Sequence, residues 1–142
     1  MLTDDFNRPQ KPAVSTYHIH IYYEVGAGSE AEAKGLAARI AKAFPGHVKE
    51  VHEYDKPGGP HAASNVAVHF GAKGFGEIVQ WLQFNAGELS MLVHPKSGDV
   101  IKDHIDYGLW LGPRREGLLS TPYFDRKKAE KGLKNNPVPP KP

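Results

Sequence analysis

The 142-residue chain contains no cysteine, which excludes disulfide bonds, thiolate-bound zinc and a cysteine nucleophile. It also lacks any run approaching the roughly 20 apolar residues that a membrane-spanning helix needs. The N-terminus has no apolar run behind a basic start, so no secretory signal is expected. These absences predict a cytoplasmic protein without a membrane partner.

The chain has no large excess of positive or negative charge, because its formal net charge is only +2. Lysine and arginine cluster near the C-terminus and form no stripe interleaved with aromatic residues, so we expect no nucleic-acid partner. Hydrophobic residues make up 39% of the chain and charged residues 24%, which is typical of a globular protein. The length suits one domain with a substantial core.

The chain divides into three parts by composition. Residues 1–14 are polar, with two prolines, and are expected to form an N-terminal arm. Residues 125–142 are rich in lysine and proline and are expected to form a loosely attached tail. The folded metal-binding domain should therefore span residues 15–124.

Hydrophobic periodicity predicts six regular elements within this domain. Alternating patterns predict strands, and apolar residues at helical spacing predict helices. Ser29 and Glu32 also fit a capping box at the first helix. The predicted strands are 17–23, 47–54, 65–70 and 89–94, and the predicted helices are 29–44 and 75–85.

The resulting order, β-α-β-β-α-β, predicts an α+β fold of the ferredoxin-like type with a C-terminal extension. Both helices should cover one face of an antiparallel sheet, with the first strand between the third and the fourth. The other face must be covered by the C-terminal segment, by a second subunit, or by both. A dimeric α+β barrel is the expected assembly.

The eight histidines are numerous for a chain of this length, and their placement suggests a metal site. His18 and His20 share the helix-free face of the first strand, where residues i and i+2 lie about 6.5–7 Å apart. Two imidazoles at that spacing can reach one ion. His94 has the same parity on the neighbouring fourth strand, so we predict that these three histidines bind a single metal.

The other histidines carry weaker signals. His69 shares the parity of the open face and should lie beside the ligands. His52 and His61 flank a loop rich in glycine and proline that can fold over this face. His104 follows Asp103, which suggests an imidazole oriented by a carboxylate. A histidine on a strand or loop is more commonly an ordinary surface residue, so these positions alone do not define a site.

Several motifs occur in a fixed order along the chain, and together they resemble the aromatic ring-opening DOPA 4,5-dioxygenase family of fungi and bacteria. The resemblance covers roughly residues 17–112. The motifs are Tyr17–Tyr23 (YHIHIYY), Gly59–His61 (GPH), Trp81–Pro95 (WLQFNAGELSMLVHP), Ser97–Asp99 (SGD), Asp103–His104 (DH) and Trp110–Gly112 (WLG).

This resemblance implies a ferredoxin-like fold, a homodimer and a non-haem metal, normally Fe(II). It also implies extradiol cleavage of a catechol such as DOPA by O₂. The chain departs from the family pattern at Ala62–Ser64, where a proline more often follows the histidine, and around Tyr107–Leu109. The histidines that match the family by position are His18, His20, His61, His94 and His104.

Extradiol cleavage requires open metal positions, so the protein should supply about three ligands. We assign His18, His20 and His94 to the metal, with His61 either replacing one of them or acting on the substrate. The reaction also needs an acid/base group, and histidine has a suitable pKa. The candidates for that role are His61 and His104, and the candidates for substrate binding are His52, Arg114 and Arg115.

Three other functions remain open from the residues alone. The same imidazoles could hold zinc in a hydrolase or lyase with zinc-bound water as nucleophile. Imidazole suits iron and zinc equally, so the sequence does not separate them. A metal-free dimeric α+β barrel, acting as a binding module or monooxygenase, would use His18 and His20 as pocket residues only. A family member could also have kept its histidines for structure alone.

Overall fold

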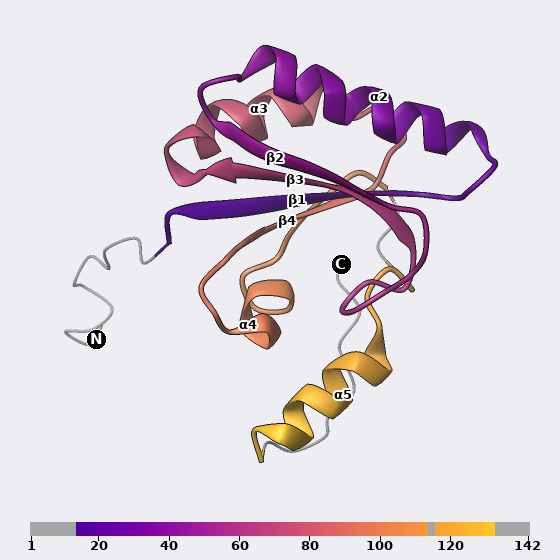
Figure 1. Ribbon diagram of the computed structural model, residues 1–142, viewed down its shortest axis with the longest axis vertical. Helices are drawn as coiled ribbons and strands as arrows, with labels where there is room; N and C mark the ends of the chain where they lie inside the picture. The colour runs from indigo at the N-terminus through magenta and orange to yellow at the C-terminus, as the bar shows by residue number, and fades with distance from the viewer. Residues whose placement is uncertain (1–13, 114–115, 133–142) are drawn as a thin grey trace, which may run out of the picture.

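The computed structural model describes residues 14–113 and 116–132, and it consists of one antiparallel sheet with helices on both faces (Figure 1). The strands are β1 (Thr16–Tyr23), β2 (Val48–Tyr54), β3 (Ser64–Gly71), β4 (Met91–Pro95) and β5 (Leu109–Leu111). The helices are α2 (Gly28–Ala43), α3 (Phe75–Asn85), α4 (Val100–His104) and α5 (Thr121–Glu130), with a 3-10 turn, η1 (Ala72–Gly74), before α3.

The five strands are ordered β2-β3-β1-β4-β5, and all neighbours are antiparallel. This arrangement confirms the α+β class and the predicted position of the first strand between the third and the fourth. The predicted β-α-β-β-α-β elements are all present, with bounds that differ by at most two residues. The fifth strand was not predicted, because a three-residue strand is too short to show a reliable alternation.

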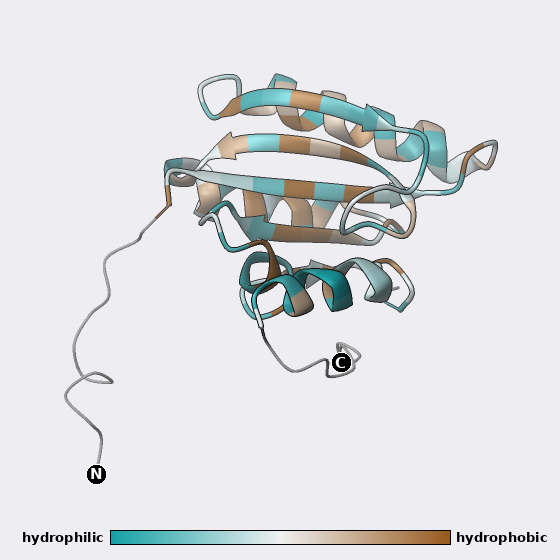
Figure 2. Ribbon diagram, turned by 60° about the horizontal axis from the view of Figure 1, so that its bottom comes forward, coloured by the Kyte–Doolittle hydropathy of each residue, from teal (hydrophilic) through white to brown (hydrophobic). Residues whose placement is uncertain are grey.

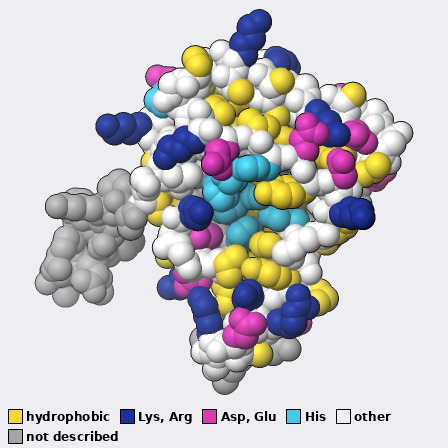
Figure 3. Space-filling model, in the orientation of Figure 1, with side chains coloured by type: hydrophobic (Ala, Val, Ile, Leu, Met, Phe, Trp, Pro, Cys, Tyr) yellow, Lys and Arg dark blue, Asp and Glu magenta, His cyan; other side chains and the backbone are white. Residues whose placement is uncertain are grey.

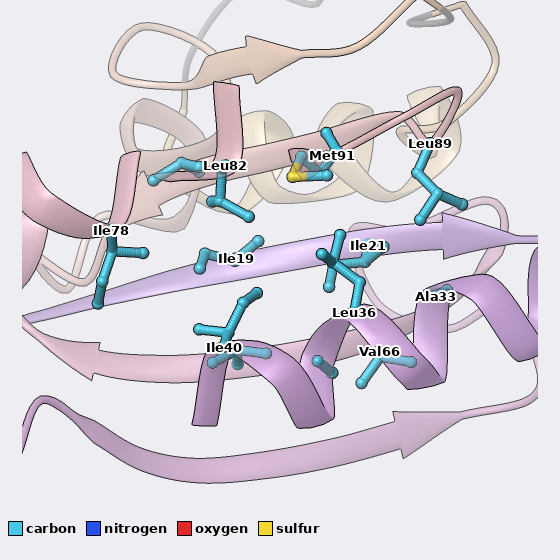
Figure 4. Packing of buried hydrophobic residues seen from close by; sticks show 14 of the residues in the cluster. Ile19, Ile21, Ala33, Leu36, Ile40, Val66, Ile78, Leu82, Leu89 and Met91 are labelled. Carbon is cyan, nitrogen blue, oxygen red and sulfur yellow. The ribbon is translucent and has the colours of Figure 1, made fainter. Parts of the chain in front are cut away.

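The main core lies between the sheet and helices α2 and α3 (Figure 4). Ile19 and Ile21 point from β1 into this layer and are fully buried. They pack among Leu36 and Ile40 of α2 and Ile78 of α3. Burying one such side chain contributes roughly 1.5–3 kcal/mol. This layer fixes the side-chain parity of β1, so the intervening histidines must face the other side of the sheet.

The start of α2 differs from the prediction. The helix begins at Gly28 with Ala27 as N-cap, and no side chain caps it. Ser29 Oγ accepts a hydrogen bond from the Glu24 N–H, and Glu30 Oε1 accepts one from the Gly26 N–H. These contacts stabilise the turn before the helix, so the predicted Ser29–Glu32 capping box was wrong. By contrast, Gly87 follows α3 with φ +60, as expected of a residue that ends a helix.

In the C-terminal segment, β5 extends the sheet at its edge, and α4 and α5 lie on the second face of the sheet (Figures 1 and 2). Tyr22, Leu92, Trp110 and Leu118 form a smaller apolar cluster there. Phe124 of α5 is fully buried, and the helix continues past the expected domain boundary at 124. The prediction that the C-terminal segment covers this face is therefore confirmed. The homodimer and the dimeric barrel stay predictions.

Within the described ranges, no helix is both long enough and apolar enough to cross a membrane. The longest, α2, has 16 residues and a polar outer side. Residues 1–13 of the predicted arm and residues 133–142 of the predicted tail lie outside the described residues.

Candidate metal centre

Three histidines form a row across the sheet on the face away from α2 and α3. His18 of β1 lies opposite His69 of β3 and opposite His94 of β4 in the strand register. The rings of His18 and His69 are stacked, with centroids 3.7 Å apart. His20 lies two residues further along β1, opposite the small residue Ala67. The predicted parity of these side chains is therefore confirmed.

Two further histidines reach the same place from segments without sheet periodicity. His61 comes from the loop after β2, where its backbone forms bridges to Gly58 and Leu119. His104 is the last residue of α4. The rings of His20 and His61 have centroids 3.9 Å apart, and those of His94 and His104 are 4.0 Å apart. His20, His61, His94 and His104 are each at most 7% exposed.

Each of these four rings is held at Nδ1 by a partner outside the cluster. His94 Nδ1 donates to the Pro95 carbonyl and His104 Nδ1 to the Val100 carbonyl, both at 2.8 Å. His20 Nδ1 lies 2.9 Å from Asn65 Oδ1. Asn65 Nδ2 donates to a carbonyl oxygen, so its Oδ1 is the atom that accepts from His20. Histidines that bind metals are typically anchored in this way through the second ring nitrogen.

The inward-facing Nε2 atoms of His20 and His94 have lone pairs without protons. Because His20 and His94 carry their protons on Nδ1, their Nε2 atoms are both acceptors, yet these atoms lie 3.1 Å apart. His18 Nε2 is also buried and has no hydrogen-bond partner among the described residues. Two nitrogens each about 2.0–2.1 Å from one ion, at an angle near 90°, would lie about 3 Å apart. The three residues therefore fit a divalent metal.

Burial also keeps these rings neutral. It lowers the pKa of His18 to about 4, and nearby positive charge on His69 and Lys96 adds to the effect. It lowers the pKa of His61 to about 3 and of His94 to about 2. The pKa of His20 is also well below its usual value, mainly through burial. Neutral imidazole is the form that binds metals, so the cluster is ready for an ion at pH 7.

Two sets of three histidines have ligand atoms within 4.8 Å of one another, and both contain His20. One is the predicted set of His18, His20 and His94. The other joins His20 to His61 and His104, the two predicted acid/base residues. The structure thus brings all five histidines together, while their division into ligands and acid/base groups stays a prediction.

The carboxylate of Asp103 does not orient His104 directly. Asp103 accepts hydrogen bonds from the Ser97 N–H and hydroxyl instead. His104 is oriented by the Val100 carbonyl, one turn earlier in the same helix. The inference from the Asp-His pair was therefore wrong, because on a helix adjacent side chains point away from each other.

Of the predicted substrate residues, the structure describes only His52. His52 lies on the exposed strand β2, where its Nε2 is 2.9 Å from Glu50 Oε2. The same carboxylate oxygen lies 3.3 Å from His69 Nδ1. His52 does not line the cavity at the histidines, so its role stays a prediction. Arg114 and Arg115 lie outside the described residues.

Sequence reasoning missed two residues of the site. Asn65 is 2% exposed and fixes His20. Tyr22, also buried, lies with its hydroxyl 2.8 Å from His61 Nδ1. Tyr22 shares the parity of His18 and His20, which could have marked it. Asn65 sits opposite Tyr22 in the register, and an amide inside an apolar strand was the available signal.

The histidines line the floor of a cavity of about 540 Å³, which is in the usual range for small-molecule sites. Figure 3 shows the histidine side chains gathered in one hollow of the surface, with charged side chains around it. Loop residues from Lys56 to His61 form one wall, and the segment from Lys96 to His104 contributes the other. A metal on the floor would thus be open to a substrate.

Comparisons with known proteins agree with this geometry. Residues 17–120 match the model of the Dopa 4,5-dioxygenase family. The chain is 28% identical over 106 residues to a DOPA 4,5-dioxygenase of Amanita muscaria, covering 70% of this chain and 46% of that enzyme. It is 29% identical over 119 residues to an uncharacterised 21.2 kDa protein of Botryotinia fuckeliana, covering 77% of this chain and 64% of that protein. The chain therefore spans less than two thirds of either curated relative.

A solved structure is also similar. The crystal structure of a proposed dioxygenase from Nostoc punctiforme superposes with a TM-score of 0.63 at 29% sequence identity. The match covers 81% of this chain and 95% of the Nostoc chain.

Proposed function

The chain belongs to the Dopa 4,5-dioxygenase family, and on this basis we propose that it is a non-haem Fe(II) extradiol dioxygenase. Its substrate would be a catechol such as DOPA, whose ring it opens with O₂. The observation that carries the proposal is the pair of Nε2 atoms of His20 and His94, which face each other at 3.1 Å without a proton between them. A shared metal cation would relieve the repulsion between two such lone pairs.

We assign the metal to His18, His20 and His94. The buried, unpartnered Nε2 of His18 supports the choice of this residue as the third ligand. Three protein ligands leave positions for other groups. When bound, Fe(II) would supply a Lewis acid that binds the catechol oxygens and brings O₂ beside them.

His104 and His61 would then handle protons. His104 donates from Nδ1 to the Val100 carbonyl, so its Nε2 is free to take a catechol proton. His61 is held by the Tyr22 hydroxyl and stands over His20, on the wall formed by the loop. Both residues are buried, so the proton transfers would occur away from bulk water.

Metal content of purified protein tests the ligand assignment. We expect about one metal per chain in the wild type, and loss of it in His20→Ala and His94→Ala. His47→Ala is the matched control, because His47 lines no part of the cavity. Full metal content in both site variants would contradict the assignment.

The two possible ligand sets can be separated in the same experiment. If His18 is the third ligand, His18→Ala loses the metal, whereas His61→Ala and His104→Ala keep it and lose ring cleavage. The reverse pattern would move the metal to the second set. Dioxygen uptake and a yellow product from DOPA in the Fe(II) protein test the activity. Hydrolase or lyase activity of the zinc-loaded protein would instead favour the zinc-dependent alternative.

A further inference from the structure

Two lysines at the mouth of the cavity form no ion pair with any residue that the structure describes. Lys56 lies in the loop between β2 and β3, which also carries His61, and Lys96 directly follows β4. Both line the cavity, and neither side chain forms an ion pair with a described residue. Two positive charges at one opening create a potential that favours anionic ligands.

The backbone of Lys96 lies close to the histidines. Its backbone N–H donates to the Thr16 carbonyl at 3.0 Å, which fixes the chain beside β1. Burial is the largest cause of the lowered pKa of His18 and of His69, and the positive charge of Lys96 is a further cause. The ammonium group is therefore within electrostatic reach of the cavity floor.

Among the residues that the structure describes, the cavity lining offers no free negative charge. Asp103 is the one carboxylate among the described residues that line it, and both of its oxygens are engaged by Ser97. Glu50 lies outside the lining, and its Oε2 contacts His52 and His69. A ligand ammonium group would thus find no free carboxylate among the described residues that line the cavity.

Glycines leave space at the same mouth. Gly59 and Gly98 both line the cavity with positive φ, and a Cβ at either position would meet no atom within 4 Å. If a catechol ring lies with its oxygens at the histidine floor, its side chain would extend toward the part of the cavity that Lys56 and Lys96 line.

From this arrangement we propose that Lys56 and Lys96 form a carboxylate-binding subsite, so that the preferred substrate is a catechol with an acidic side chain and no required amino group. The inference rests on the proposed function, because it places the catechol ring at the metal. It narrows the substrate class to catechol carboxylic acids, for which an α-ammonium group as in DOPA adds no affinity.

Anaerobic calorimetry of the Fe(II)-loaded protein tests the subsite without turnover. The probes are 3-(3,4-dihydroxyphenyl)propionate, its methyl ester, DOPA and dopamine. We expect the acid to bind about tenfold more tightly than the ester, in line with a hydrogen bond to a charged group. DOPA should bind no more tightly than the acid, and dopamine should bind more weakly than the ester.

Lysine variants complete the test. Lys96→Met and Lys56→Met should each reduce the difference between acid and ester, and added salt should reduce it in the wild type. Lys73→Met is the control, because Lys73 is an exposed lysine outside the cavity. Ring cleavage of every probe is then measured in air with the same proteins.

The outcomes separate the two proposals. Equal affinities for acid and ester, with ring cleavage of both, would overturn the carboxylate subsite and leave the dioxygenase function intact. Tighter, lysine-dependent binding of the acid without cleavage of any catechol would support the subsite and overturn the dioxygenase function. Tighter binding of DOPA than of the acid would also overturn the proposed substrate class.

Discussion

Replacing Asn65 by leucine should weaken metal binding although Asn65 itself touches no metal. Asn65 is 2% exposed, and its Oδ1 accepts the Nδ1–H of His20 at 2.9 Å. Leucine has the same branching and number of side-chain heavy atoms, although it is bulkier, and it cannot accept this hydrogen bond. The His20 ring then loses the contact that fixes both its orientation and its tautomer.

The size of the effect follows from this contact. Loss of an outer partner of a metal-binding histidine lowers metal affinity by roughly 10- to 100-fold, which is about 1.4–2.7 kcal/mol of binding free energy. The buried Nδ1–H left without an acceptor should also lower folding stability by about 1–3 kcal/mol.

Competition with a coloured chelator measures the metal affinity, and circular dichroism checks that the variant is folded. Asn85→Leu is a matched control, because Asn85 also makes two side-chain hydrogen bonds, to Trp81 and Arg39, but lies outside the cavity. A folded Asn65→Leu protein with metal affinity within twofold of the wild type would refute the role of Asn65.

Three other predictions follow from the same site. The metal-free protein should lose stability as the pH falls from about 6.5 toward 4, because the unfolded chain binds protons there while the pKa values of buried His61 and His94 lie near 3 and 2. Each of these two rings should contribute about 1.4 kcal/mol per pH unit to the loss of folding stability. Equal urea midpoints at pH 5 and pH 7 would contradict this prediction. Phe124→Ala should destabilise the protein by about 3–5 kcal/mol, measured by urea denaturation, because its fully buried ring packs α5 against His104; a loss below about 1 kcal/mol would argue against that docking. Tyr22→Phe should retain the metal but lower kcat about tenfold, because His61 loses its hydroxyl partner; an unchanged kcat would remove His61 from the proton transfers.

The sequence by itself determined the sheet and one face of the site. The alternation of Tyr17 to Tyr23 sets which side chains of β1 are buried under the helices. His18 and His20 must then lie on the other face, whatever the rest of the chain does. The same parity argument placed His94 and His69, because strand pairing keeps side chains of like parity on one side of a sheet.

Only the tertiary structure decided which other groups meet these histidines. His61 and His104 lie in a loop and at the end of a short helix, where no periodicity predicts the direction of a side chain. Their positions depend on long-range contacts, such as the pairing of His61 with Leu119 and the packing of His104 against Phe124. The contacts of Asn65 and Tyr22 likewise depend on the register between β1 and β3, which local sequence patterns do not encode.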